Sequence, residues 1–300
     1  MPSPISLCDT AMQPAGFLSA RALLGRYGLQ AKKSWGQNFL VDERTFAAII
    51  GATAAGPGDV VVEIGAGLGT LTHRLLGTGA QVFAVERERD MCHVLQQELG
   101  GFPKFSLLAQ NALTLDLEAL CAQQKQPLLL VGNLPYNIAS PLLFRFSQSR
   151  AGLRRAVVMV QREMGERLLA QPGSRQSNSL GLQIQMFWHL RKVCPVGAGA
   201  FVPPPRVDSM VVSMTPRPGP AFPLRCAETF ASVVRAAFSQ RRKTLRNALF
   251  AAYAKDASLG ALSQVGIDPG RRAETLSLSE WAALSDALVG VLQARSDGLR

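Results

Sequence analysis

The sequence lacks the cysteine and histidine patterns that metal sites and disulfide frameworks need. Its five cysteines are scattered through 300 residues, and none stands in Cys-x-x-Cys spacing. Its three histidines, His73, His93 and His189, are isolated from one another. An odd number of unpatterned cysteines suggests a reducing compartment, and neither a structural zinc site nor a Ser-His hydrolase finds support. We therefore expect no metal in this protein.

Long apolar runs and acidic residues are also scarce. No run approaches the roughly 18 apolar residues of a membrane span, and no charged start is followed by a secretory core. We therefore expect a cytoplasmic protein without membrane contact. The chain has 32 Lys and Arg against 21 Asp and Glu, a net charge of +11, and its pI is near 10.0. This basic excess points to an anionic partner such as nucleic acid.

The length and the distribution of prolines suggest more than one domain. Three hundred residues, 47% of them hydrophobic, allow one large or two ordinary domains. The proline-rich segment 216–223 is the clearest linker. We interpret residues 1–30 as a flexible basic tail, with a transit peptide for organellar import as the less favoured alternative. An α/β domain then covers residues 31–216, and a helical domain covers residues 217–300.

A strand, a glycine-rich turn and a helix follow one another early in the α/β domain. The β-branched strand 59–64 leads directly into the turn. The turn has glycines at Gly65, Gly67 and Gly69. Glycines let the backbone approach a ligand closely, and Glu86, at the end of the next strand (81–85), can accept both hydroxyls of a ribose. The dinucleotide fingerprint needs a glycine at Thr70, so the spacing favours S-adenosylmethionine over NAD in a Rossmann-like fold.

Three further strands are predicted at 105–110, 127–131 and 154–161. In open α/β sheets ligands bind outside the carboxyl ends of the strands, so the residues just beyond these ends are site candidates. Asn111 follows the first of them. Its side chain could hydrogen-bond the amine of a bound adenine, or it could simply complete a turn.

The segment Asn133-Leu134-Pro135-Tyr136 follows the strand 127–131 and brings an amide, a proline and an aromatic ring together. An adenine amine is a poor nucleophile because its lone pair is delocalised into the ring. Acceptors that hold both N–H bonds could draw that lone pair out of conjugation, while an aromatic face fixes the base by stacking. The alternative is a capped turn in which Tyr136 fills a gap. Phe201, before three prolines, could stack on the same base or belong to the core.

Basic residues without acids follow the linker. Between residues 230 and 250 the apolar residues form one helical stripe, and basic residues form a neighbouring one. The basic residues of this stretch are Arg235, Arg241, Arg242, Lys243 and Arg246. We expect them to bind RNA phosphates, the alternative being a merely solvated face.

Five motifs occur in order along the chain. They are Lys33-x-x-Gly36-Gln37-Asn38-Phe39-Leu40, Glu63-Ile64-Gly65-x-Gly67-x-Gly69, Asn133-Leu134-Pro135-Tyr136-Asn137-Ile138, Phe201-x-Pro203-Pro204-Pro205-x-Val207-Asp208-Ser209 and Phe238-x-Gln240-Arg241-Arg242-Lys243-Thr244-Leu245-Arg246-Asn247. Together they resemble the KsgA-type ribosomal RNA adenine dimethyltransferases, from about residue 30 to the C-terminus.

The resemblance implies transfer of methyl groups from S-adenosylmethionine to N6 of two adjacent adenosines in the 3′-terminal stem-loop of small-subunit rRNA. It implies that this rRNA and the assembling 30S-type particle are the partners; we expect a monomer. The implied cofactor-binding residues are Gln37, Asn38, Leu40, Gly65, Gly67, Glu86, Asn111 and Asn133. The family usually has Asp in place of Asn111, and because an amide oxygen still accepts a hydrogen bond, we expect altered affinity and retained binding.

In this interpretation Asn133 and the backbone carbonyl of Leu134 or Pro135 accept the two N6 hydrogens, while Tyr136 and Phe201 sandwich the extruded base. No general base is required, so positioning supplies most of the rate. The competing hypotheses are a large-subunit rRNA adenine methylase of the macrolide-resistance type, a non-catalytic ribosome-assembly or transcription factor on the same fold, and a DNA amino-methylase.

Overall fold

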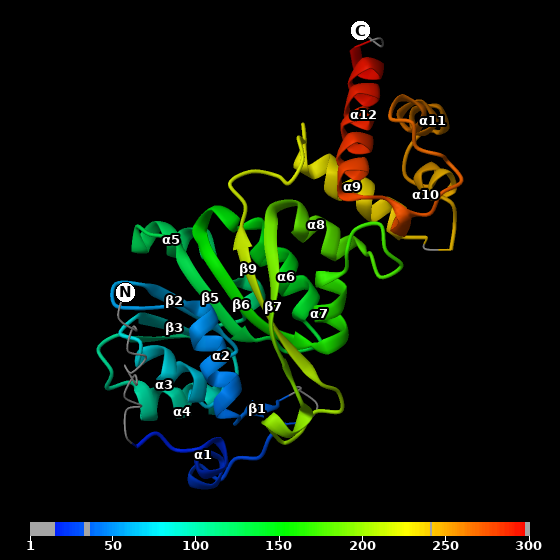
Figure 1. Cartoon of the computed structure of the whole chain (residues 1–300). Coiled ribbons are helices and arrows are strands. Elements are labelled where there is room, and N and C mark those ends of the chain that lie inside the picture. Colours follow the sequence, from blue (N-terminus) through cyan, green and yellow to red (C-terminus); the bar gives the residue numbers. More distant parts are fainter. Residues whose placement is uncertain (1–15, 33–36, 241, 298–300) are drawn as a thin grey trace, which may run out of the picture.

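A mostly parallel sheet organises the larger part of the molecule (Figure 1). The computed structural model describes residues 16–32, 37–240 and 242–297. Within them, a seven-stranded sheet is hydrogen-bonded in the order β4-β3-β2-β5-β6-β9-β7. Its strands are β2 (Val60–Ile64), β3 (Gln81–Glu86), β4 (Phe105–Ala109), β5 (Leu128–Asn133), β6 (Leu153–Gln161), β7 (Trp188–Val196) and β9 (Ser209–Pro216). The five predicted strands are confirmed as β2 to β6, which are parallel to one another.

The order of the strands reverses around β2. From β2 the chain adds β3 and β4 on one side, and it then crosses to β5 and β6 on the other. Ligands of open α/β sheets bind at such a reversal, outside the carboxyl ends of the strands. The last two strands are antiparallel additions, since β9 runs against β6 and β7 runs against β9.

Helices cover both faces of the sheet, as the predicted α/β class requires. One face carries α2 (Glu43–Thr53), α3 (Thr70–Leu76) and α4 (Arg89–Leu99), and the other carries α5 (Leu117–Gln124), α6 (Ala139–Gln148), α7 (Arg162–Leu169) and α8 (Ser179–Phe187). Successive side chains of a strand point to opposite faces, so Val62 packs in one core and Val61 in the other. This double burial explains why β2 and β5 are apolar on both faces, with Glu63 of β2 as the exception.

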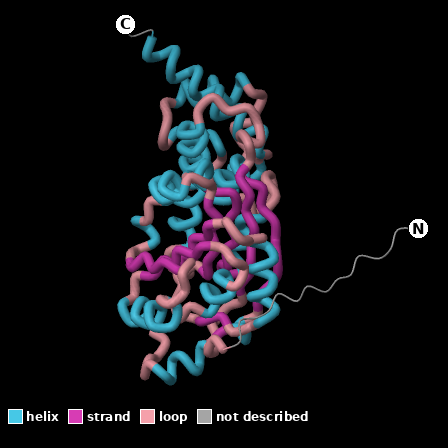
Figure 2. Tube along the Cα trace, turned by 90° about the vertical axis from the view of Figure 1, so that its left-hand side faces the viewer, coloured by secondary structure: helices cyan, strands magenta, loops and turns pink. Residues whose placement is uncertain are grey.

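The C-terminal residues form a helical part with its own core. It contains α9 (Ala227–Phe238), α10 (Leu245–Phe250), α11 (Lys255–Gln264) and α12 (Leu278–Asp297). Phe230, Leu249 and Trp281 are fully buried there. Figure 2 shows this part at one end of the α/β part, which makes the molecule elongated. Among the helices described, none combines the length and the apolarity that crossing a bilayer requires.

The single helical stripe predicted over residues 230–250 is wrong. The helix α9 ends at Phe238 and α10 begins at Leu245. The first amides of α10 bond to a neighbouring segment, because Leu245 N–H donates to the carbonyl of Arg271 at 2.7 Å and Arg246 N–H to that of Pro269 at 3.1 Å. The apolar residues of α9 and α10 therefore pack in one shared core, although they belong to two separate helices.

The flexible tail predicted for residues 1–30 is wrong for its described part. Residues 20–26 form the helix α1 (Ala20–Arg26), whose Leu23 is fully buried against the α/β part. The hydroxyl of Tyr27 donates to Glu98 at 2.8 Å. The composition of the segment drew attention to its charges, but its apolar side chains decide its structure. Residues 1–15 lie outside the described residues.

Candidate functional site

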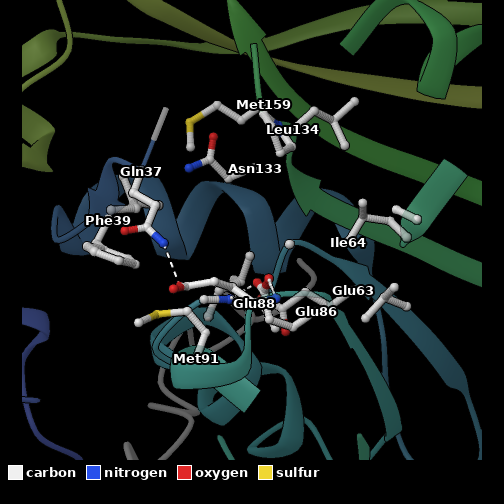
Figure 3. Close-up of a pocket in the computed structure, with 18 of the residues that line it drawn as sticks. Gln37, Phe39, Glu63, Ile64, Glu86, Glu88, Met91, Asn133, Leu134 and Met159 are labelled. Carbon is white, nitrogen blue, oxygen red and sulfur yellow. Dashed lines mark hydrogen bonds between the residues drawn. The ribbon is translucent and has the colours of Figure 1, made fainter. Parts of the chain in front are cut away.

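A cavity lies at the carboxyl ends of β2, β3, β4 and β5 (Figure 3). All eight predicted cofactor-binding residues line it, and Gln37, Glu86 and Asn133 among them are labelled in Figure 3. Leu134, Pro135 and Tyr136 line it as well, whereas Phe201 does not. The topology accounts for this gathering, because each of the motifs stands at a strand end or in the segment of β1 (Phe39–Leu40) that crosses the cavity. Within the described residues, no group of three or more His, Cys, Asp or Glu side chains is placed to hold a metal ion.

The glycine turn forms one wall of the cavity with a backbone that needs glycine. Gly65 and Gly67 have φ angles of +72° and +55°, in the left-handed region that other residues rarely adopt. A Cβ on Gly67 would lie only 3.2 Å from Cε1 of Phe39. Gly69 serves the packing of helices instead, because a Cβ there would lie 2.9 Å from Cδ1 of Leu99.

Glu86 is held at the cavity edge by backbone amides. Its Oε2 accepts from Gly67 N–H at 3.0 Å, and its Oε1 accepts from the N–H groups of Arg87 at 2.8 Å and Glu88 at 3.0 Å. These three bonds orient the carboxylate at the tip of β3, where the sequence predicts ribose binding.

Glu88 is a cavity residue that the sequence analysis missed. It is buried, and its Oε2 accepts from Gln37 Nε2 at 2.7 Å (Figure 3). Its Oε1 pairs with the ammonium of Lys32, which also contacts Asp90 at 2.9 Å. Glu88 therefore anchors the segment before β1 over the cavity. A carboxylate two residues after Glu86 carries no sequence signal, because its partners lie more than 50 residues away.

The orientation of the Asn133 amide is fixed by the main chain of another motif. Its Nδ2 donates to the carbonyl oxygen of Asn38 at 3.2 Å. A carbonyl oxygen can only accept, so the nitrogen must face Asn38 and the oxygen Oδ1 must face away from it. Oδ1 has no hydrogen-bond donor among the described residues. The bond spans 95 positions, so Asn133 does not cap its own turn, and its free acceptor suits the predicted contact with an amine.

Only one of the two candidate backbone acceptors is available in the turn. The carbonyl of Pro135 accepts from Ile138 N–H at 3.0 Å. The carbonyl of Leu134 has no donor within the part of the chain that the structure describes, although Leu134 N–H itself donates to Met159 at 3.0 Å. Of the two carbonyls, that of Leu134 is therefore the one left without a donor among the described residues.

Tyr136 is held by its hydroxyl group. The phenol oxygen lies 2.6 Å from Oγ of Ser209 on β9. Burial raises the pKa of Tyr136 above its usual value, and the hydrogen bond to Ser209 partly opposes this shift. The side chain therefore stays neutral at physiological pH, as a stacking ring should.

Phe201 lies in the core. It stands on β8 (Phe201–Val202), paired with Leu40 of β1, and is only 2% exposed. Its neighbours in the core include Phe46 and Val211. Of the two interpretations of Phe201, the structure shows packing, and its stacking on a base stays a prediction.

We expected the amide oxygen of Asn111 to face the ligand, but the structure turns the oxygen away from it. Its Oδ1 accepts from Leu113 N–H at 3.0 Å and caps the short helix η2 (Ala112–Thr114). The NH₂ group is then the end that is free to face the cavity. The turn alternative is what the structure shows, and the free end of the Asn111 amide is a hydrogen-bond donor.

The predicted RNA-binding residues lie in the helical part, far from the cavity. Arg235, Arg242, Lys243 and Arg246 are exposed, and none makes an ion pair with a described residue; Arg241 lies outside the described residues. The helical part follows the C-terminal end of β9, which is beside the N-terminal end of β6 because the two strands are antiparallel. The helical part therefore lies at the end of the sheet opposite to the carboxyl ends of β2 to β5, where the cavity is (Figure 1).

Known proteins share both the fold and the sequence. The chain is 48% identical over 280 residues to the ribosomal RNA small subunit methyltransferase A of Anaeromyxobacter dehalogenans (strain 2CP-C), covering 90% of this chain and 98% of the relative. It is 42% identical over 285 residues to the protein of the same name from Myxococcus xanthus (strain DK1622), covering 93% and 98%.

Two solved structures show the same fold. A dimethyladenosine transferase from Plasmodium falciparum has a TM-score of 0.68 at 24% identity, covering 87% of this chain and 98% of that one. The 23S rRNA methyltransferase ErmE has a TM-score of 0.65 at 24% identity, covering 84% and 100%. The model of the family described as ribosomal RNA adenine dimethylase matches residues 28–289. This chain belongs to the ribosomal RNA adenine dimethylase family.

Proposed function

We propose that this protein transfers methyl groups from S-adenosylmethionine to N6 of two adjacent adenosines in the 3′-terminal stem-loop of small-subunit rRNA, forming N6,N6-dimethyladenosines. The relatives named as small-subunit enzymes support this substrate at 42–48% identity. The likeness to a 23S enzyme is one of fold alone, so the large-subunit alternative is not favoured. The observation that carries the proposal is the pair of free acceptors, Asn133 Oδ1 and the Leu134 carbonyl, in one turn beside the glycine wall.

The cavity fits S-adenosylmethionine. The positive φ angles of Gly65 and Gly67 leave room for a ligand against the backbone. Glu86 is oriented for ribose hydroxyls, and Asn111 stands where an adenine would lie. When bound, the cofactor supplies a methyl group on a sulfonium, which is a good leaving group.

The protein's contribution to methyl transfer is positioning. Asn133 and Leu134 accept the two N6 hydrogens, which turns the nitrogen lone pair towards the methyl group. The neutral ring of Tyr136 holds the base by stacking, and its bond to Ser209 fixes the ring plane. No side chain needs to remove a proton before transfer. Alignment of the reacting atoms then supplies most of the acceleration.

We further propose that the enzyme acts as a monomer on an assembling 30S-type particle in the cytoplasm. All eight predicted cofactor-binding residues line one cavity, so the proposed site needs no residue from a second copy of the chain. The bacterial sources of the relatives support the cytoplasm.

The test is methylation of purified subunits. The protein is incubated with labelled S-adenosylmethionine and small subunits that lack the modification, and the modified positions are mapped by primer extension. Two adjacent modified adenosines in the 3′-terminal stem-loop are expected. Label in large subunits or in DNA, or no label in any of them, would overturn the proposed substrate.

A further inference from the structure

Met159 stands beside Asn133 in the cavity wall, and none of the steps above uses its side chain. The two residues are paired across the parallel strands β5 and β6, so their side chains point to the same face of the sheet. Met159 lines the cavity although it is only 1% exposed. Figure 3 shows its thioether next to the Asn133 amide, on the side of the cavity away from Glu86 and Glu88. The wall beside the proposed acceptor is therefore a methionine side chain.

The other neighbour of Asn133 in the sheet has no side chain. The strand β2 pairs with β5 as far as Ile64 and Gly132, and the next residue of the chain is Gly65. A Cβ on Gly65 would lie 3.5 Å from the backbone oxygen of Asn133. Within the described strands, Met159 is thus the one side chain that flanks Asn133 on this face. The width of the space beside Asn133 depends on it.

The main chain around Met159 is fixed, whereas its side chain can adapt. Its carbonyl accepts from Leu134 N–H at 3.0 Å, which holds the turn of the two acceptors against β6. The side chain packs in the same core as Phe201 and Val211. A methionine side chain is unbranched, has several rotatable bonds and carries a polarisable sulfur, so it fills irregular space and tolerates changes in it. Met159 therefore combines a fixed position with a compliant surface.

Two methyl transfers to one nitrogen need different amounts of space. The first transfer takes an amine whose two N–H bonds are accepted by Asn133 Oδ1 and the Leu134 carbonyl. In the second transfer a methyl group has replaced one of these hydrogens. A methyl group is larger than a hydrogen and makes no hydrogen bond here, so it needs apolar space beside one of the acceptors. The Leu134 carbonyl belongs to the main chain and cannot move aside, whereas the wall beside Asn133 can.

We propose that Met159 is a specificity-determining residue, which makes room beside Asn133 for the first methyl group and so permits the second transfer to the same nitrogen. This inference rests on the proposed dimethylation. In the second step the Leu134 carbonyl accepts the remaining N6 hydrogen, and the first methyl group packs against the Met159 thioether. The nitrogen lone pair forms the new N–C bond, the electron pair of the broken S–C bond stays on sulfur, and the last N6 proton leaves to solvent.

The test separates the two transfers in time. Small subunits that lack the modification are incubated with excess enzyme and S-adenosylmethionine. The 3′-terminal rRNA fragment is digested to nucleosides at intervals, and mass spectrometry measures N6-methyladenosine and N6,N6-dimethyladenosine. The ratio of the second rate constant to the first is compared between the wild type, Met159→Ile and Met159→Ala. The matched control is Met214→Ile, because Met214 is also 1% exposed in the same sheet but packs in the core of the opposite face, outside the cavity.

The isoleucine variant should stop the reaction after one methyl group. Isoleucine has about the volume of methionine but carries it close to the main chain on a stiff, β-branched side chain. The ratio should fall by about tenfold in Met159→Ile, the usual cost of crowding a packed site, and N6-methyladenosine should accumulate. The first rate constant should stay within a few-fold of the wild type. In Met159→Ala, which leaves space, the ratio should be equal to the wild-type ratio or higher, and Met214→Ile should not change it.

Two outcomes would overturn the inference: equal ratios in Met159→Ile and Met214→Ile, or an equal fall in Met159→Ile and Met159→Ala, which would show that Met159 only supports the surrounding fold. A partial loss of folded protein lowers both rate constants and leaves their ratio unchanged. If Met159→Ile does not fold, the volume-conserving Met159→Leu replaces it, and an unchanged ratio there would contradict the inference equally.

Failure of this inference differs from failure of the proposed function. A wild type that forms N6,N6-dimethyladenosine no faster, relative to the first transfer, than Met159→Ile refutes the role of Met159 alone. A wild type that transfers no methyl group to the small subunit refutes the proposed function, and the inference with it.

Discussion

The cavity and the helical part hold their charged side chains in opposite ways. In the cavity, charged side chains are buried or oriented, as Glu86 is by three backbone amides and Glu88 by Lys32 and Gln37. In the helical part, Arg242, Lys243 and Arg246 are exposed, without an acidic partner among the described residues. The first arrangement selects one ligand by geometry. The second suits a polyanion, whose phosphates are attracted at a distance and without a single fixed contact.

The largest expected effect comes from removing the Asn133 amide from the cavity. Asn133→Ala removes the oriented acceptor and should lower methyl transfer by a factor on the order of 100 to 1,000, the usual cost of one preorganised hydrogen-bonding group. RNA binding, measured by filter retention, should stay within a few-fold of the wild type. Gln123→Ala, an exposed change on α5 outside both the cavity and the basic residues, is the control. Activity of Asn133→Ala equal to that of this control would refute the acceptor role.

Glu63→Gln tests how much the buried carboxyl group of the cavity lowers the stability of the folded protein. The pKa of Glu63 is raised in the folded state, so the folded protein binds more protons than the unfolded chain between about pH 4.5 and pH 8. The free energy of unfolding should therefore fall as pH rises through this range in the wild type. The free energy of unfolding of the variant lacks this slope and should exceed that of the wild type by up to about 5 kcal/mol at pH 9. Denaturant unfolding of both proteins from pH 5 to pH 9 measures the difference, and parallel curves would contradict the burial of an uncompensated carboxyl.

The helical side is tested by removing charge. The double variant Arg242→Gln and Arg246→Gln should weaken RNA binding and lower the slope of log affinity against log salt by roughly one unit for each lost phosphate contact. The control removes two exposed charges of the edge strand β7, with Arg191→Gln and Lys192→Gln. If both double variants change the slope equally, the basic residues of the helical part act only through net charge.

The smallest expected effect comes from replacing the NH₂ group of Asn111, in the cavity wall, by an oxygen. In Asn111→Asp one carboxylate oxygen can keep the cap on Leu113 while the other accepts from the adenine amine. Binding of S-adenosylhomocysteine should therefore tighten by about tenfold, as for a hydrogen bond to a charged group. The same ligand without its 6-amino group should gain nothing from the change. An equal gain for both ligands would show that Asn111 does not contact the amine.

The sequence predicted most of the cavity because strand ends and glycine spacing are local signals. Residues at the carboxyl ends of parallel strands must meet at one edge of the sheet, so Gly65, Glu86, Asn111 and Asn133 could be placed together. The orientation of their atoms could not be predicted, since the partner of Asn133 lies 95 positions away. The surroundings of Phe201 could not be predicted either, because they depend on the pairing of β8 with β1.

The errors in the remaining parts have a common physical cause. The charges of residues 16–30 suggest a flexible tail, but Leu23 packs in one core with Leu68 and Met91. The apolar stripe of residues 230–250 has helical spacing throughout, yet α9 ends at Phe238, and the first amides of α10 donate to the carbonyls of Arg271 and Pro269. In both cases tertiary contacts outweigh the local pattern.

The helix α8 belongs to both parts of the molecule. Its Ile184 packs in the sheet core, while Leu182 and Met186 pack with the residues of α9 to α12. The segment after β9 is tied to the same helix, since Arg217 and Ala221 donate to the carbonyls of Phe187 at 2.8 Å and Met186 at 2.7 Å. The spacing between the basic residues and the Asn133 turn is therefore set by the packing of α8 in both cores. An RNA held by both would have to present its phosphates and its target adenosines at one built-in separation, so the enzyme would measure the shape of its substrate as well as its bases.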